Sequence, residues 1–315
     1  MTERNFMEML KAKWPETLLC VGLDTDPEKI SREIEALIRK DDKLPPSESI
    51  GPLMRGYNAR VIEATKDLVC AYKPNFAFYE AHGLQGLWAL KETVAFIKTV
   101  APDVPIIGDA KRGDIGKTNL GYIKAAFDVY GVDAMTVHPY LGQEEGMQVF
   151  LDRRDKGIIV LCRTSNKGAR EFQDLLTLPA DFFDNESIWL TSLAWVQDQA
   201  LPLYQRVAKN VAQNWNANGN CAVVAGATYA EDIKVIRKII GDDMPILIPG
   251  VGTQGGDLEK AVKNGINSKG DGIIINSSSG ILYKSTGPDF AQAARMEAKR
   301  LRDEINKYRK SARRQ

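Results

Sequence analysis

Short apolar runs recur along the chain, and each ends in polar residues before a helical pattern begins. The runs lack the apolar–polar alternation of a half-exposed strand, so they predict strands that are buried on both faces, as in a parallel sheet. We expect eight such strands, at residues 17–23, 69–72, 104–107, 134–137, 157–162, 221–224, 245–248 and 272–275.

Segments with apolar residues at helical spacing separate these runs. We expect helices at residues 27–40, 53–67, 84–100, 119–130, 144–152, 189–215, 230–240 and 258–264, and a last one that starts at Pro288. A polar segment at residues 167–186 interrupts the alternation after the fifth strand. A loop of that length inside a compact domain is usually functional or mobile.

The alternation of strand and helix predicts an α/β fold, a (β/α)8 TIM barrel that spans residues 1–315 as a single domain. It has extra N-terminal helices, an insertion after strand five and a C-terminal helix. A doubly wound open sheet is the alternative. No GxGxxG follows the first strand, and polar residues recur after many strands, not at one switch point, so the barrel is favoured.

Charged side chains follow the third apolar run, which ends abruptly in Asp109, Lys111 and Asp114. Strand alternation puts Asp109 and Lys111 on the same face. Two carboxylates and an ammonium group at the end of a buried strand cost stability, so they indicate a functional site. The alternative is a structural ion network at the top of the barrel.

Other strand ends add to this group, because Asp24 follows the first run and Lys73 the second. In a barrel these ends meet at one rim, where active sites of the fold lie. Glycine-rich ends follow the last two strands, at residues 249–256 and 276–280. They predict a phosphate site, since backbone N–H groups must approach the oxygens closely.

Composition excludes several classes of protein. The formal net charge of +1 gives no general attraction to nucleic acid or membranes, and we interpret the basic C-terminal tail as a solvated end. No apolar run approaches membrane-spanning length, and the N-terminus has no secretory signal. Four cysteines inside apolar runs, none in a CxxC pair, indicate a reducing, cytoplasmic location. Two histidines without a carboxylate cluster argue against a zinc site.

The motif Asp-Ala-Lys-Arg-Gly-Asp-Ile-Gly at residues 109–116 resembles the signature of orotidine 5′-monophosphate decarboxylase. The resemblance continues in Gly-Leu-Asp (22–24), Lys-Pro-Asn (73–75), Arg-Thr-Ser-Asn (163–166) and Pro-Gly-Val-Gly-Thr-Gln-Gly-Gly (249–256). The Lys-Pro-Asn form and the chain length are similar to the larger bacterial, type 2-like branch. The family decarboxylates orotidine 5′-monophosphate (OMP) to UMP and CO2, the last step of de novo pyrimidine synthesis, without a cofactor or a metal.

The resemblance implies a role for each matching residue. Lys111 protonates C6 as CO2 leaves, and Asp109 lies against the substrate carboxylate. Asp114 comes from the neighbouring subunit of a homodimer and completes, with Lys73, an alternating array of four charges. The implied substrate-binding residues are Asp24, Asn75, Ile115, Thr118 (also from the partner), Thr164, Ser165, Gly250, Gly252, Gln254, Ser279 and Gly280.

One position departs from the family pattern. The family carries an arginine on the phosphate just after strand eight, where this sequence has Ser279. A serine hydroxyl and backbone N–H groups can hold a phosphate, but a bidentate, charge-assisted contact is lost. Either another cation compensates, with Arg163, Lys167 or Lys284 as candidates, or the site is weakened.

Three other functions compete with this interpretation. A sugar-phosphate decarboxylase or synthase of the same suprafamily shares Asp-x-Lys-x-x-Asp and uses magnesium. A Schiff-base aldolase could use Lys73 or Lys111, but flanking aspartates keep an ammonium group charged and oppose nucleophilic use. A non-catalytic nucleotide-phosphate binder is the third. His138 is expected to be a packed, hydrogen-bonded residue at a strand end.

Overall fold

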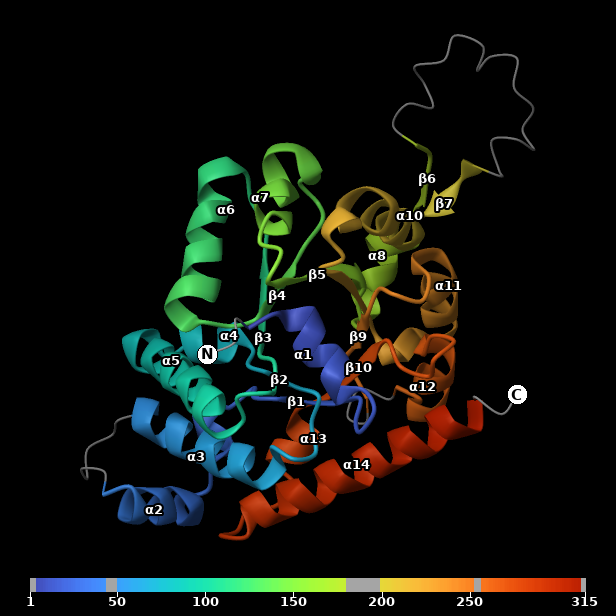
Figure 1. Cartoon of the computed structure of the whole chain (residues 1–315). Helices are drawn as coiled ribbons and strands as arrows, with labels where there is room; N and C mark the ends of the chain where they lie inside the picture. The colour runs from blue at the N-terminus through green and yellow to red at the C-terminus, as the bar shows by residue number, and fades with distance from the viewer. Residues whose placement is uncertain (1–3, 44–49, 180–198, 252–255, 313–315) are drawn as a thin grey trace, which may run out of the picture.

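Eight parallel strands form the central sheet (Figure 1). The computed structural model describes residues 4–43, 50–179, 199–251 and 256–312. The strands are β1 (Leu19–Gly22), β2 (Ala71–Lys73), β3 (Ile107–Arg112), β4 (Ala134–Val137), β5 (Gly157–Arg163), β8 (Cys221–Ala225), β9 (Ile246–Ile248) and β10 (Ile273–Ser277). Their order around the sheet is β2-β1-β10-β9-β8-β5-β4-β3, which is the order of a barrel opened between β2 and β3.

Backbone hydrogen bonds connect the two end strands. The N–H of Tyr72 donates to the carbonyl of Pro105 at 3.1 Å, and the N–H of Asp109 donates to the carbonyl of Pro74 at 2.9 Å. These bonds close the ring, so the predicted (β/α)8 barrel is confirmed. The third strand, β3, begins later than the predicted run at 104–107 and continues through Asp109 and Lys111.

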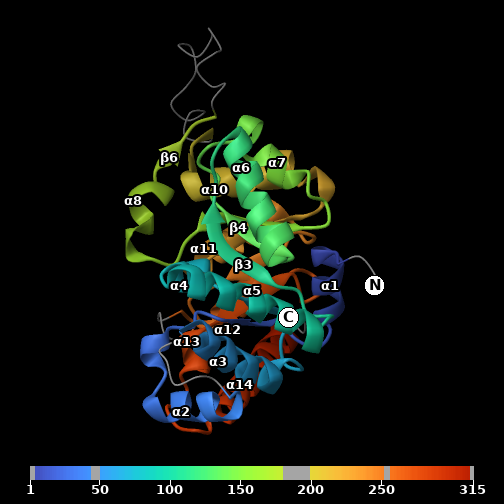
Figure 2. The same ribbon diagram turned by 90° about the vertical axis from the view of Figure 1, so that its left-hand side faces the viewer.

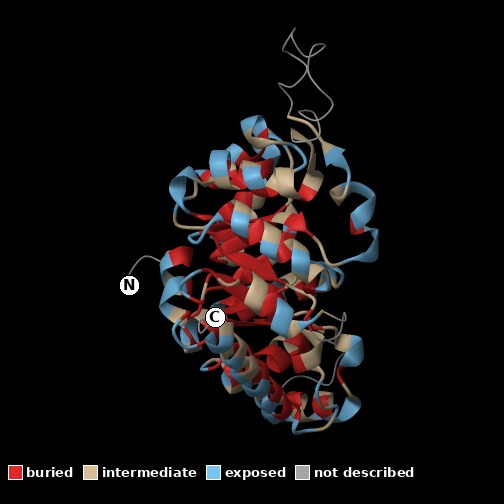
Figure 3. Cartoon of the chain, turned by 90° about the vertical axis from the view of Figure 1, so that its right-hand side faces the viewer, coloured by how far each residue is buried: buried red, intermediate tan, exposed pale blue. Residues whose placement is uncertain are grey.

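The strands are apolar because they are covered on both sides. Every residue of β1, β4, β8 and β9 is buried, and these side chains form one continuous core with the inner faces of the helices. Figure 3 shows this arrangement, with buried residues in the central strands and exposed residues on the outer helix faces.

Helices surround the barrel and connect its strands. They are α1 (Phe6–Lys13), α2 (Arg32–Asp41), α3 (Ile50–Thr65), α4 (Phe76–Glu80), α5 (Gly83–Val100), α6 (Gly116–Ile123), α7 (Gln148–Leu151), α8 (Arg170–Gln173), α10 (Leu203–Asn210), α11 (Ala230–Ile240), α12 (Leu258–Gly265), α13 (Ser279–Leu282) and α14 (Phe290–Ala312). The C-terminal α14 packs along α3 and α12 (Figure 1). Figure 2 shows α1 on the opposite side of the molecule from α8, which follows the carboxyl end of β5.

The predicted helix at residues 189–215 is interrupted at residues 201–202. Leu201–Pro202 forms strand β7, which pairs antiparallel with β6 (Leu176–Thr177), and α10 begins at Leu203. A proline forces the residue before it toward an extended conformation, so Leu201 cannot continue a helix. The segment predicted as a polar loop at 167–186 holds a short 3-10 helix, α8 and β6 up to residue 179. Residues 180–198 lie outside the described residues.

Two other predicted helices are interrupted. The one at 27–40 consists of a 3-10 helix (Pro27–Lys29) followed by α2, because the hydroxyl of Ser31 accepts from the N–H of Ile34 and starts a new helix. In the one at 144–152, Glu145 has a φ of 56°, so the regular α7 begins only at Gln148. None of the helices in the described ranges is both long and apolar enough to cross a membrane.

Candidate active site

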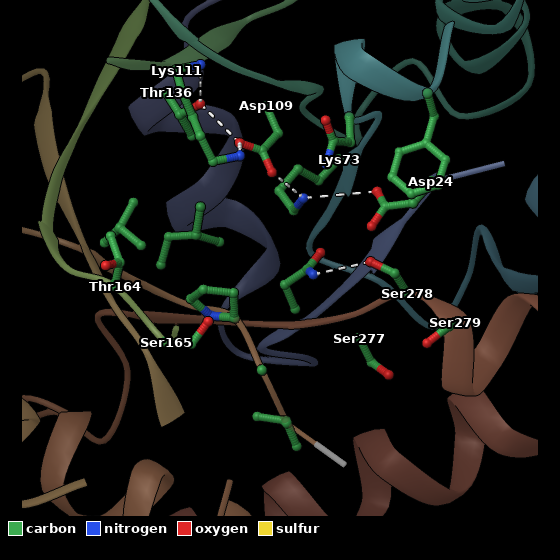
Figure 4. A pocket seen from close by; sticks show the side chains of 18 of the residues that line it. Asp24, Lys73, Asp109, Lys111, Thr136, Thr164, Ser165, Ser277, Ser278 and Ser279 are labelled. Atoms are coloured by element: carbon green, nitrogen blue, oxygen red, sulfur yellow. Dashed lines mark hydrogen bonds and ion pairs between the residues drawn. The ribbon is translucent and has the colours of Figure 1, made fainter. Parts of the chain in front are cut away.

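A cavity of about 560 Å³ lies at the carboxyl ends of the barrel strands (Figure 4). Strand ends far apart in the sequence contribute to it, as the rim position of the fold predicts. Nine of the predicted site residues line it: Asp24, Lys73, Asn75, Asp109, Lys111, Thr164, Ser165, Gly250 and Ser279.

Asp109 is the centre of a charged array on the cavity wall. Its Oδ2 lies 2.7 Å from Nζ of Lys73, and its Oδ1 lies 2.7 Å from Nζ of Lys111. The hydroxyl of Thr136 also donates to Oδ1, at 2.9 Å, and Nζ of Lys73 is 3.9 Å from Oδ1 of Asp24 (Figure 4). The charges therefore alternate in sign from β1 across β2 to β3.

Mutual attraction keeps this array ionised despite burial. Burial alone would raise the pKa of Asp109, but the ammonium groups of Lys73 and Lys111 outweigh it and hold that pKa well below its usual range. Burial would lower the pKa of Lys73, but Asp109 and Asp24 outweigh it and raise that pKa. A buried carboxylate at this point is therefore negative at every physiological pH, and it faces whatever the cavity binds.

Lys111 has the backbone geometry of an irregular strand, not of a straight one. Its φ is 51°, and the pairing of β3 with β4 shifts between Gly108 and Arg112. A left-handed conformation costs a residue other than glycine about 1 kcal/mol. The N–H of Lys111 donates to the hydroxyl of Thr136 at 2.9 Å, which holds the residue there. Its side chain is 50% exposed, so the ammonium group reaches a ligand while it contacts Asp109.

Two cavity residues have hydrogen-bond capacity left over. Oδ1 of Asp24 and Oδ1 of Asn276 are buried without a hydrogen-bond partner among the residues that the structure describes. An unpaired buried acceptor costs free energy. A bound molecule that donates hydroxyl or amide hydrogens removes that cost. Asn276 opens the segment 276–280 that the sequence predicts as part of a phosphate site, but it is not among the individually predicted binding residues.

Three serines form the opposite part of the lining, Ser277 to Ser279. β1 approaches them closely, because a Cβ on Gly22 would lie 1.9 Å from Oγ of Ser278. Gly250 at the end of β9 has a φ of 88°, which only glycine adopts easily. Gly280 follows in α13 and is not among the lining residues, and Gly252 and Gln254 lie outside the described residues.

Asp114, Ile115 and Thr118 do not line the cavity of their own chain. The carboxylate of Asp114 accepts from the N–H of Ile115 at 2.7 Å, and Asn119 accepts from the N–H of Asp114 at 2.8 Å. Ile115 and Thr118 are exposed. All three therefore lie outside the cavity, with Asp114 half-buried, and one chain supplies only the Lys73–Asp109–Lys111 part of the array.

Two of the three candidate cations for Ser279 are bound elsewhere. Nε of Arg163 lies 2.8 Å from Oδ2 of Asp232. Nη1 of Arg163 forms an ion pair with Oδ1 of Asp174 at 2.6 Å, but without the geometry of a hydrogen bond. Nζ of Lys284 lies 3.2 Å from Glu297. Neither these two nor Lys167 is among the lining residues. Compensation by Arg163, Lys167 or Lys284 therefore stays a prediction, since the described lining of the cavity includes none of them.

Several lining residues carry no signal in the sequence. Thr136 stands within an apolar strand, Lys29 within a predicted helix, and Tyr283 beyond the last strand. Of these residues, only Thr136 could have been selected from the sequence, because it lies in a strand beside the one that carries predicted site residues. His138 is hydrogen-bonded as expected, with Nε2 3.0 Å from the carbonyl oxygen of Gly113.

Comparison with known proteins gives one family. A family model for orotidine 5′-phosphate decarboxylase / HUMPS matches residues 17–182. The chain is 42% identical to orotidine 5′-phosphate decarboxylase of Cellvibrio japonicus over 304 residues, which cover 96% of this chain and 98% of the relative. It is 41% identical to that of Ralstonia pickettii over 306 residues, 96% of this chain and 99% of the relative.

A solved structure agrees with these relatives. OMP decarboxylase of Leishmania donovani superposes with a TM-score of 0.74 at 30% identity, over 97% of this chain and 99% of that chain. The similarity thus extends over nearly the whole chain, including every strand that contributes to the cavity. The chain belongs to the orotidine 5′-phosphate decarboxylase / HUMPS family.

Proposed function

We propose that this chain decarboxylates OMP to UMP and CO2 in the cavity described above, with Lys111 as the proton donor. It is a carbon–carbon lyase of its family, and relatives of that name match it over 98–99% of their length. The observation that carries the proposal is the Lys73–Asp109–Lys111 array, which puts a half-exposed ammonium group beside a buried carboxylate on the cavity wall.

The chemistry follows from these charges. The C6–carboxylate bond breaks, CO2 leaves, and its electron pair stays on C6. The ammonium group of Lys111 stabilises that negative charge as it develops and then gives C6 a proton, becoming a neutral amine. Asp109 faces the substrate carboxylate, and the repulsion between these two negative charges is relieved only when CO2 leaves. Since both lysines contact Asp109, the array holds Lys111 in place before substrate binds.

The rest of the cavity supports substrate binding. Asp24 and Asn276 have free acceptors for ribose hydroxyls or ring N–H groups. Thr164 and Ser165 line the cavity at the end of β5 and would bind the pyrimidine, and Asn75 also lines the cavity. The serines at the end of β10 and Gly250 also line the cavity and would bind the phosphate. The contacts with the ribose and the phosphate, which lie far from C6, align the reacting carbon with Lys111.

A direct assay tests the function. Purified protein is mixed with OMP in metal-free buffer, and UMP formation is followed by absorbance. We expect turnover that is unchanged by a chelator. Loss of activity in chelator would favour the magnesium-dependent alternative. Covalent trapping of substrate by borohydride would favour a Schiff-base mechanism. Binding of UMP without turnover of OMP would leave only a nucleotide binder.

We further propose a homodimer in which each cavity receives Asp114 and Thr118 from the partner. Exposed apolar side chains surround the loop that bears Asp114, namely Ile115, Leu120, Tyr140 and Leu141. Asn119 connects this loop to the next, because its side chain donates to the carbonyl of Gly146 at 2.9 Å. Apolar groups that gather beside a carboxylate outside the cavity are typical of a surface that another subunit covers. We place the enzyme in the cytoplasm, which fits four buried cysteines without disulfides.

Subunit mixing tests this dimer. Asp109→Ala and Asp114→Ala each inactivate a homodimer, but a heterodimer of the two contains one cavity with both aspartates intact. We expect such heterodimers, purified with two different tags, to recover up to about half of the wild-type activity per dimer if two sites act independently. Verified heterodimers without activity would contradict the shared site, and Asp109→Ala mixed with itself is the control.

A further inference from the structure

We infer that Lys29 is the cation that binds the phosphate of the nucleotide, in the place that Ser279 leaves without a charge. This inference rests on the proposed function and adds to it a residue that determines affinity for the phosphorylated substrate. Lys29 ends the 3-10 helix Pro27–Lys29 after β1, and it lines the same cavity as the array.

The distribution of charge within the cavity points to this residue. The cationic side chains in the described part of its lining are Lys29, Lys73 and Lys111. Lys73 and Lys111 both contact Asp109 at 2.7 Å, so their charge is directed at the reacting end. A phosphate monoester, which carries nearly two negative charges at neutral pH, therefore has one lysine left to meet it.

Tyr283 links this lysine to the segment that bears the serines. Nζ of Lys29 lies 5.4 Å from the centre of the Tyr283 ring. The hydroxyl of Tyr283 accepts from the N–H of Asp26 at 2.7 Å and donates to the carbonyl of Asp24 at 3.1 Å. The N–H of Tyr283 in turn donates to the carbonyl of Ser279 at 3.1 Å. One tyrosine thus connects the segment that bears Lys29 with the segment that bears Ser279.

Lys29 is also the least constrained of the three lysines. Its nearest carboxylate oxygen, on Asp26, is 3.8 Å away, beyond hydrogen-bond distance, and its side chain is 56% exposed. The other oxygen of Asp26 already accepts from the N–H of Glu28 at 3.1 Å. An exposed pair of this kind contributes little stability. The ammonium group can therefore turn from Asp26 to an incoming phosphate at low cost.

Lys29→Met tests the inference, because methionine keeps most of the side-chain length and removes the charge. A charge-assisted contact to phosphate is expected to contribute roughly tenfold to a hundredfold in affinity. We expect the KM for OMP to rise by that factor while kcat stays within about twofold, since Lys29 does not contact the array. By calorimetry, UMP should bind more weakly by the same factor, and uridine, which lacks phosphate, should bind as before.

Lys66→Met is the matched control. Lys66 is also partly exposed and pairs with a carboxylate three residues away, Glu63, but it lies outside the cavity lining. We expect wild-type KM and UMP affinity in this variant. Adding Ser279→Arg to Lys29→Met should restore most of the lost affinity, because it supplies another cation in the lining of the same cavity.

Three results would overturn the inference. These are an unchanged KM in Lys29→Met, an equal loss of affinity for UMP and uridine, or a double variant that Ser279→Arg does not improve. They differ from failure of the proposed function, which would appear as a wild-type protein that forms no UMP. The comparison of UMP with uridine tests Lys29 in either case.

Discussion

Two ion clusters at the rim of this barrel have opposite arrangements of charge. At the end of β3, the carboxylate of Asp109 lies between the ammonium groups of Lys73 and Lys111. At the end of β5, the guanidinium of Arg163 lies between the carboxylates of Asp174 and Asp232. Both clusters bring together residues from separate elements, and both central groups are largely buried.

The clusters differ in what their members can still contact. The guanidinium of Arg163 lies 5.0 Å from the ring centre of Tyr204 and 3.9 Å from that of Tyr229, and its side chain is 3% exposed. Its charge is used within the fold. Lys111 is half exposed to the cavity, and Asp24 beside the array keeps an unused acceptor. A charge cluster therefore indicates a binding site only where a charged group remains exposed to the cavity.

The Arg163 cluster supports the cavity from outside. Asp174 directly follows α8 and Asp232 lies in α11, so Arg163 fixes both to the end of β5. The next residue, Thr164, lines the cavity and is held by Gln173 of α8, which accepts from its N–H at 3.0 Å and donates to its hydroxyl at 2.8 Å. Variants in the two clusters should therefore affect different properties: chemistry in one case, positioning and stability in the other.

Lys111→Ala is expected to have the largest effect. It removes the proton donor and a positive charge near C6, so kcat for OMP should fall roughly 10⁴-fold or more. Because Lys111 is half exposed, the free energy of unfolding should change by no more than about 1 kcal/mol. Steady-state absorbance assays and urea unfolding measure the two quantities. Activity close to wild type would exclude Lys111 as the proton donor.

A comparison of Asp109→Asn with Arg163→Met distinguishes the two clusters by the free energy of unfolding and its dependence on pH. Asp109→Asn leaves buried Lys73 with only Asp24 at 3.9 Å, so it should destabilise the fold by about 3 kcal/mol or more. Arg163→Met leaves two carboxylates that are a quarter to a third exposed, so its cost should be smaller, and kcat should stay within roughly tenfold of wild type.

The pH dependence of the free energy of unfolding identifies the contribution of Asp109 to stability. Its folded pKa lies below the unfolded value of about 4, so the stability it provides is complete above that pH and is lost as the pH falls toward the folded pKa. The difference in free energy of unfolding between wild type and Asp109→Asn should be constant from about pH 5 to 9 and shrink below about pH 4. A difference that is the same at pH 3 and pH 7 would contradict this origin.

Gln173→Leu is expected to have the smallest effect. It removes two hydrogen bonds that hold Thr164, so the KM for OMP should rise about three- to tenfold, with kcat within about twofold. Glu171→Gln, an exposed change in the same helix, is the control and should behave as wild type. A fall in kcat with an unchanged KM would indicate that Gln173 acts on the reacting groups instead.

The sequence alone determined the barrel and the core of the candidate site. The alternation of apolar runs and helical patterns has a local physical cause, since strands covered on both faces must be apolar throughout. Asp24, Lys73, Asp109 and Lys111 were predicted because each follows such a run, and a barrel collects these ends at one rim.

Only the tertiary structure decided the rest. Thr136, Tyr283 and Lys29 reach the cavity through contacts between segments up to about 250 residues apart, as between Asp26 and Tyr283, and no local pattern encodes such distances. The β6–β7 pair arises because Pro202 ends a pattern that otherwise resembles a helix. Arg163 is a candidate phosphate cation by its sequence, but in the fold Asp174 and Asp232 lie beside it. A residue's charge is set by its sequence, but whether that charge is free to bind a ligand depends on the neighbours that folding brings to it.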